Sequence, residues 1–153
     1  NKFQKKYPIA QNAVQLQQGT VMDLYPTILS VADVDAPKGY PLDGSDLKKL
    51  LQGKADKKHR DDFLMHFPHG EHRANYFTTY RKGDWKLIYY YNPDTTGEPS
   101  WKLYNLKEDP YETSDVATKY PDKTASMIEL MKKRLEAENA LYPLDKNGNI
   151  CKP

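Results

Sequence analysis

The sequence has a single cysteine, no long apolar run and no initiating methionine. Cys151 lies near the end of the 153 residues, so an internal disulfide framework is excluded. No stretch approaches the roughly 18 apolar residues that a membrane helix needs, and we expect no membrane span. The sequence starts at Asn1 without the apolar core of a signal peptide. We therefore expect an internal start, with any secretion signal upstream.

An excess of charge of one sign is also missing. The 23 basic and 21 acidic residues leave a net charge of +2. A nucleic-acid binder usually has a strong basic excess, so we expect no nucleic-acid partner. The sequence contains no Gly-rich phosphate loop, no Gly-x-Ser-x-Gly elbow and no Cys-x-x-Cys pair. Its acids are not paired as a glycosidase requires. The sequence therefore gives no support for a phosphate-binding loop, a serine hydrolase, a Cys-x-x-Cys site or a glycosidase.

Aromatic residues are what the sequence has in quantity. It carries 12 Tyr, 4 Phe and 2 Trp, although only 38% of its residues are hydrophobic and its mean hydropathy is −0.89. Tyr and Trp bury large areas while offering a polar edge. We therefore expect a small core built on aromatics, and much surface that is either solvated or made to meet a partner.

Hydrophobic spacing and turn residues predict an α+β fold. Two short helices, capped by Asp23 and Ser45, precede four strands and one long helix that Pro143 stops. Such grouping favours a four-stranded antiparallel sheet packed by a long C-terminal helix, preceded by two short helices. The predicted ranges are 23–32 and 46–52 for the short helices, 62–67, 76–80, 85–90 and 101–105 for the strands, and 121 to about 141 for the long helix.

The other segments are predicted to lie outside these elements. Residues 1–19 are expected to form an extended or poorly ordered lead-in, and residues 143–153 a polar tail. Residues 54–61 are charged and are predicted to be a solvated loop. Nothing around Cys151 in the tail predicts a nucleophile.

Three histidines follow one another at intervals of three, as His66, His69 and His72, and Arg73 comes directly after them. A metal site is one interpretation, because His is a common ligand. The intervening proline and glycine exclude a helical site, although a loop could gather the ligands. An inert polar loop is the second interpretation. The third is an anion-binding cleft, because Arg offers a planar fork of donors and protonated His can donate.

The predicted hairpin of residues 76–90 carries aromatic side chains on both faces. They could form a platform on which a sugar ring stacks, or they could pack across strands. Packing is favoured for Trp85 and Leu87, while both interpretations stay open for Tyr89, Tyr90 and Tyr91. The platform would consist of Tyr76, Tyr80, Trp85 and Tyr89.

Four segments in sequence order resemble the C-terminal region of sulfatases. The run SWKLYNLKEDPYE at 100–112 resembles the signature LYNLxxDPxE that closes this region. The segments that resemble those before it are VMDLYPTIL at 21–29, LDGSDLKKLLQG at 42–53 and YRKGDWKLI at 80–88. With the helix that follows, the resemblance covers residues 20–142. The amino-acid sequence of these segments is most similar to that of bacterial sulfatases of the arylsulfatase type.

The resemblance implies the smaller part of a two-part enzyme. The larger N-terminal part would be an alkaline-phosphatase-like α/β domain. It would hold calcium and a formylglycine that matures from a Cys/Ser-x-Pro-Ser-Arg motif. This sequence lacks that motif, and Cys151 is followed only by Lys152 and Pro153. No nucleophile or metal ligand is therefore carried over to this chain. Calcium and formylglycine are implied for the missing N-terminal domain, and a periplasmic or secreted location is implied by the family.

On this resemblance, the chain is expected to be a C-terminal sulfatase fragment that is inactive alone. It would support the missing N-terminal domain and form part of the wall that binds a sulfated glycan or aryl sulfate. His66 and His69 are the leading candidates for that wall, followed by His72 and Arg73. The alternatives are a stand-alone binding module for sulfated or acidic glycans, and a purely structural domain. We also expect exposed apolar surface around residues 23–32, and self-association through it.

Overall fold

The computed structural model describes residues 5, 7–68, 76–91, 100–145 and 147–153. The chain divides into two compact units, Asn1–Asp61 and Asp62–Pro153, and each is described by itself. Within the described part of the chain, no helix has the length and apolar character needed to cross a membrane.

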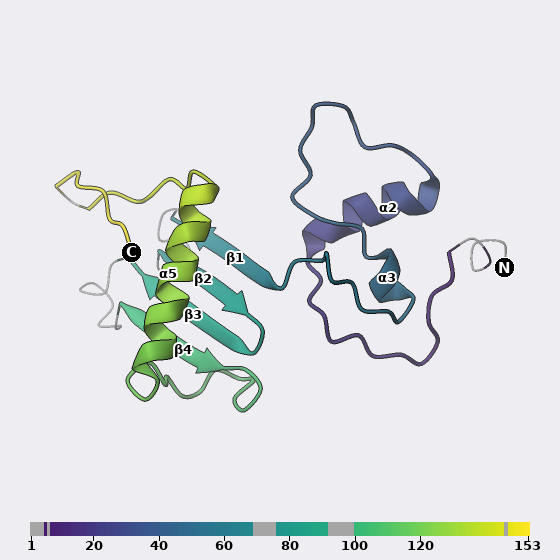
Figure 1. The fold of residues 1–153 in the computed structure, drawn as a ribbon. Coiled ribbons are helices and arrows are strands. Elements are labelled where there is room, and N and C mark those ends of the chain that lie inside the picture. Colours follow the sequence, from purple (N-terminus) through teal and green to yellow (C-terminus); the bar gives the residue numbers. More distant parts are fainter. Residues whose placement is uncertain (1–4, 6, 69–75, 92–99, 146) are drawn as a thin grey trace. The chain divides into compact units, whose positions relative to one another are not determined.

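The second unit is built on a four-stranded antiparallel sheet in the order β1-β2-β3-β4 (Figure 1). Neighbouring strands are also consecutive in the sequence, so the sheet is a simple meander without crossover connections. Gly83, at a φ of +57°, makes the turn between β2 and β3, a conformation that glycine adopts without strain. The strands are β1 (Asp62–Phe67), β2 (Phe77–Lys82), β3 (Trp85–Tyr90) and β4 (Trp101–Asn105).

Helix α5 (Pro121–Ala137) lies across one face of this sheet (Figure 1). Tyr80, Leu87 and Leu103 share a register row, so their side chains point to the same face. Met127, Met131 and Leu135 meet them from the helix, at the spacing of four that keeps side chains on one side. These residues form the core of the unit. The predicted α+β architecture is therefore confirmed, including the long helix on the sheet.

Helix α5 ends at Ala137, earlier than the sequence indicates. Asn139 takes a left-handed conformation at a φ of +50°, and the Ala140 amide donates to the Leu135 carbonyl at 3.0 Å. This is a Schellman ending, in which the chain leaves the helix and satisfies its last carbonyls. The helix is closed by this local geometry, well before Pro143 is reached.

The first unit contains η1 (Val21–Asp23), α2 (Leu24–Ala32) and α3 (Lys48–Leu51). Helix α3 is shorter than the predicted 46–52, and Ser45 does not cap it. Instead, the Asp46 carboxylate accepts a hydrogen bond from the Lys48 amide at 2.8 Å. The described part of the lead-in turns at Asn12, which has a φ of +51°, and is hydrogen-bonded to the rest of the unit. The Ala10 amide donates to the Leu51 carbonyl at 2.8 Å, for example.

Candidate functional site

His66 is the one predicted site residue that the structure describes. It lies next to the last residue of β1, and its neighbour in β2 is Thr78. Its Nε2 is 2.7 Å from the Leu141 carbonyl oxygen, and its Nδ1 is 2.7 Å from the Thr78 hydroxyl oxygen. Because a carbonyl can only accept, Nε2 carries the proton and donates it. In the neutral ring Nδ1 then accepts from Thr78, so both ring nitrogens of His66 are bonded.

Tyr91 extends this arrangement into the interior of the unit. Its side chain is only 4% exposed, and its hydroxyl lies 2.7 Å from the Thr78 oxygen. Burial raises the pKa of Tyr91 to about 12, so the phenol keeps its proton and can donate it. The result is one chain of donors that runs from Tyr91 through Thr78 and His66 to the Leu141 carbonyl. Consecutive hydrogen bonds of this kind polarise and strengthen one another.

Aromatic rings surround His66 at this end of the sheet. One register row crosses all four strands as His66, Thr78, Tyr89 and Trp101. The Tyr89 ring packs on Trp101 with centroids 4.4 Å apart, and Tyr142 meets His66 edge-on at 5.8 Å. We call this group the aromatic end. It consists of His66, Tyr89, Tyr91, Trp101 and Tyr142.

The aromatic residues of the hairpin are engaged in packing. Tyr80 and Leu87 lie in the core with almost no exposed surface, so Tyr80 has no free face for a sugar. Trp85 meets Tyr120 edge-on at 5.3 Å, at the opposite end of the sheet from Tyr89. Packing is therefore confirmed for Trp85 and Leu87. The predicted platform of four aromatics does not come together as one surface.

The remaining predicted residues, His69, His72 and Arg73, lie outside the described residues. Of the four predicted site residues, the structure therefore places His66 alone. Among the residues that it does describe, no group of three or more His, Cys, Asp or Glu side chains could hold a metal ion.

A second polar cluster, in the first unit, was not foreseen from the sequence. The Asp23 carboxylate is fully buried and accepts hydrogen bonds from the Thr20 amide at 2.7 Å and the Ser45 amide at 2.8 Å. The Ser45 hydroxyl lies 2.8 Å from Nδ1 of His59, whose Nε2 is 2.6 Å from the Gln18 carbonyl. This cluster thus brings together Asp23 and Ser45, which were predicted to cap two separate helices, and His59, which was predicted to lie in a solvated loop.

The ionisation of Asp23 reflects this environment. Burial acts to raise its pKa, because a charge loses hydration inside the protein. The hydrogen bonds from Ser45 and Thr20, together with the nearby His59, outweigh that effect and hold the pKa of Asp23 below its usual 3.8. The carboxylate is therefore charged at neutral pH and acts as the acceptor that organises the unit.

Two of the four family segments are joined by an ion pair. Lys86, in the segment at 80–88, places its Nζ 2.7 Å from both carboxylate oxygens of Glu112, which ends the segment at 100–112. The Leu106 amide also donates to the Asp84 carbonyl at 2.7 Å. These motif residues hold the strand β4 end and the turn after it against the hairpin. Their role in this unit is structural.

Comparisons with known proteins identify the family. The model of the N-sulphoglucosamine sulphohydrolase C-terminal family matches residues 2–140, so the chain belongs to this family of sulfatase C-terminal domains. An uncharacterised sulfatase of Schizosaccharomyces pombe is 33% identical over 120 residues, which are 72% of this chain and 20% of the yeast protein. Arylsulfatase K of Mus musculus is 31% identical over 113 residues, 71% of this chain and 20% of the mouse protein.

Solved structures share the fold. One protein, solved in complex with its substrate D-glucosamine-2-N,6-O-disulfate, is 27% identical with a TM-score of 0.59. The match covers 74% of this chain and 23% of that protein. The chain therefore spans only about a fifth of the length of the curated relatives it matches. It is the C-terminal domain of a sulfatase, without the larger part that these relatives carry.

Proposed function

We propose that the intact protein hydrolyses the sulfate ester of a sulfated amino sugar, and that this chain forms part of its substrate wall. The choice of a sulfated amino sugar is supported by the family, whose description names N-sulphoglucosamine, although its N-sulfo group is a sulfamate and not an ester. It is also supported by the structural relative that was solved with a disulfated glucosamine as its substrate. An arylsulfatase-type enzyme from a bacterium, in the periplasm or secreted, is the finer form of the proposal. The curated relatives quoted above are eukaryotic, so the bacterial source stays a prediction.

The observation that carries the proposed function is the family match over residues 2–140, and the bonding of His66 defines what this residue does in it. Because both of its ring nitrogens already have protein partners, a substrate would have to displace one of them to bind there. We therefore assign His66 to holding the start of the segment that follows β1. His69, His72 and Arg73 are the proposed substrate contacts, since Arg and protonated His suit the oxygens of a sulfate group.

Calcium and formylglycine belong, in this proposal, to the part of the sulfatase that this chain does not span. The described residues include no ligand group that fits a metal ion, and Cys151 lies at the C-terminal end. The reactive chemistry would be supplied by that larger part. This chain would orient the sulfated substrate, and alone it is expected to release no sulfate.

The test is sulfate release from D-glucosamine-2-N,6-O-disulfate by the full gene product and by the 153-residue chain. We expect turnover by the full product only. Arg73→Ala and His69→Ala in the full product should raise KM by about tenfold or more, the loss of roughly one charge-assisted hydrogen bond. Arg81→Ala, on the hairpin, is the matched control. Turnover by the purified chain alone, or unchanged KM in both variants, would refute the proposed role.

A further inference from the structure

The first unit has an unusual distribution of polar and apolar side chains. Among its described residues, the buried ones are Tyr7 and Leu50 and the polar Asp23, Thr27 and His59. Nine large apolar side chains in the same unit are exposed. A small unit that buries polar groups and exposes apolar ones lacks the core that would stabilise it alone. Where exposed apolar side chains gather on one face, they mark an interaction site.

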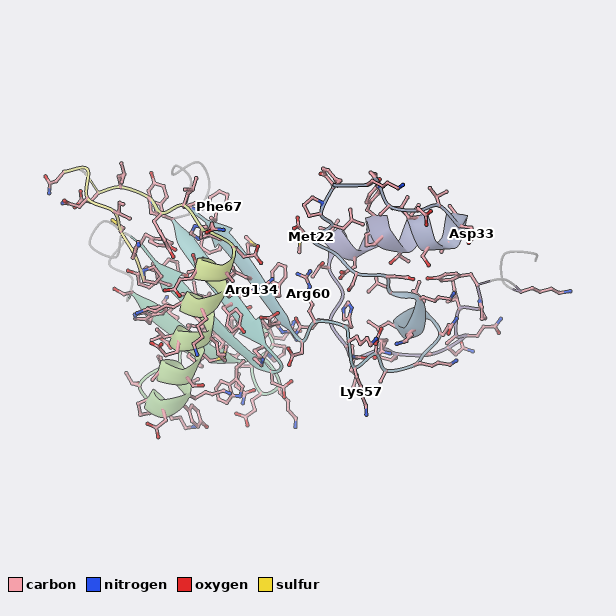
Figure 2. The ribbon with its side chains drawn as sticks, turned by 45° about the horizontal axis from the view of Figure 1, so that its top comes forward. Met22, Asp33, Lys57, Arg60, Phe67 and Arg134 are labelled. Atoms are coloured by element: carbon pink, nitrogen blue, oxygen red, sulfur yellow. The ribbon has the colours of Figure 1, made fainter. Side chains whose placement is uncertain are left out.

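Helix α2 is where the exposed apolar side chains are most ordered. Val21 in η1 is 80% exposed, and Leu24, Tyr25 and Ile28 in α2 are 52, 47 and 62% exposed. The four recur at the spacing of three and four that defines one helix face. We call them the α2 stripe. Figure 2 labels Met22, in η1 just before this helix, and Asp33, the residue that follows it.

The most buried side chain of α2 is the polar Thr27, and its hydrogen bonds are satisfied within the unit. The Thr27 hydroxyl donates to the Asp23 carbonyl at 2.6 Å and accepts from the Leu47 amide at 2.9 Å. A surface helix ordinarily turns its apolar face inward and its polar face outward. In helix α2 the most buried side chain is polar, Leu29 and Val31 are half-buried, and the stripe is exposed, so burial within this unit does not account for the stripe.

A cavity opens beside the stripe. It has a volume of about 170 Å³, shares Tyr25 with the stripe, and is completed by residues of the turn that follows Tyr40. A Cβ on Gly44 would collide with the Met22 carbonyl, so only glycine allows the turn to lie this close. The Ser45 amide bond to Asp23 fixes the same turn from the other side. The cavity is therefore preformed, and its lining includes Met22, Tyr25, Tyr40, Pro41 and Leu42.

We infer that the α2 stripe and its cavity are the docking surface for the upstream part of the sulfatase chain. This inference rests on the proposed function, because it takes the chain to be part of a longer sulfatase. The curated relatives are about five times as long as their match to this chain, and the matching family is a C-terminal one. An apolar face of that larger part covers the stripe, and one of its apolar side chains fills the cavity. Buried anchors of this kind dominate protein interfaces.

Hydrogen exchange on the 153-residue chain and on the full gene product tests the inference. In the chain alone, the amides of α2 should exchange at least about tenfold faster than those of α5, which has its own core. In the full product, α2 should be protected at least about tenfold more than in the chain alone. Equal protection of α2 in both proteins would overturn the inference. Concentration-dependent protection of the chain alone would assign the surface to a second copy instead.

Variants separate the surface from the fold. In the chain alone, Ile28→Glu should leave the thermal unfolding midpoint unchanged and reduce the binding of an apolar dye. In the full product the same change should restore fast exchange in α2. Tyr111→Glu is the matched control, because Tyr111 is 87% exposed in the second unit. A lower midpoint for Ile28→Glu in the chain alone would overturn the inference.

The outcomes distinguish this inference from the proposed function. A full product that protects α2 but releases no sulfate would refute the proposed activity alone. A full product that releases sulfate while α2 exchanges freely would refute the docking surface alone.

Discussion

Tyr91 begins the chain of donors that ends at the Leu141 carbonyl, and removing its hydroxyl tests that chain. Tyr91→Phe keeps the ring and leaves the buried Thr78 oxygen without this donor, so we expect a loss of about 1–2 kcal/mol in the free energy of unfolding. Urea unfolding of the second unit measures it. Tyr111→Phe makes the same chemical change at an exposed position and should alter stability by less than about 0.5 kcal/mol. Equal effects of the two changes would contradict the assigned chain.

The buried Asp23 carboxylate makes the stability of the first unit depend on pH. Its pKa is lowered in the folded unit, so its bonds stabilise the unit above the ordinary Asp pKa of about 3.9. That stability is lost as the pH falls through the lower folded value. The Ser45 amide, which donates to Asp23, reports the ionisation in an NMR titration. We expect its midpoint below the ordinary Asp value. A midpoint at or above that value would show that burial outweighs the hydrogen bonds.

Single residues also show where sequence reasoning ended. His66 was selected from the spacing of histidines, but its bonds reach Thr78 and Leu141, 12 and 75 positions away in the sequence. His59 was placed in a solvated loop, and it is bonded to Ser45 and Gln18, 14 and 41 positions away. Hydrogen-bond partners at such separations are set by the tertiary fold. No local pattern contains them, so the histidine spacing could not reveal that His66 is already bonded.

At the scale of elements, local patterns were sufficient for the sheet and insufficient for helix ends. The four strands and the long helix were predicted close to their observed positions, although β2 extends to Lys82 instead of ending at residue 80. Helix α5 was extended too far because Pro143 was taken as its stop. The actual ending depends on the left-handed Asn139, a weaker signal than proline or glycine.

The left-handed ending of α5 predicts that two substitutions of Asn139 change stability in opposite directions. Asn139→Gly should stabilise the second unit by up to about 1 kcal/mol, because glycine adopts a positive φ without steric cost. Asn139→Ala should destabilise it by about 1 kcal/mol, since a Cβ is strained there and alanine lacks the tolerance of asparagine. Thermal unfolding followed by circular dichroism would rank the three proteins. Alanine more stable than asparagine would contradict the left-handed assignment.

The whole molecule raises the question of which part is stable by itself. The second unit has a continuous core of Tyr80, Leu87 and Leu103 against Met127, Met131 and Leu135, and every strand is paired with its sequence neighbour. The first unit has only two buried large apolar side chains among its described residues. The family match covers both units, so family membership alone does not separate them. Burial separates them, and it assigns the stable core to the second.

We therefore predict that residues 62–153 fold without the first unit. The isolated segment should unfold cooperatively, because its core and its strand pairing are complete. Leu87→Ala, at a position with no exposed surface, should cost it about 2–5 kcal/mol, as large-to-small changes in a core do. Leu141→Ala is the exposed control and should cost less than about 1 kcal/mol. A non-cooperative transition in the isolated segment would mean that residues 1–61 supply part of its stability, against the division argued from burial.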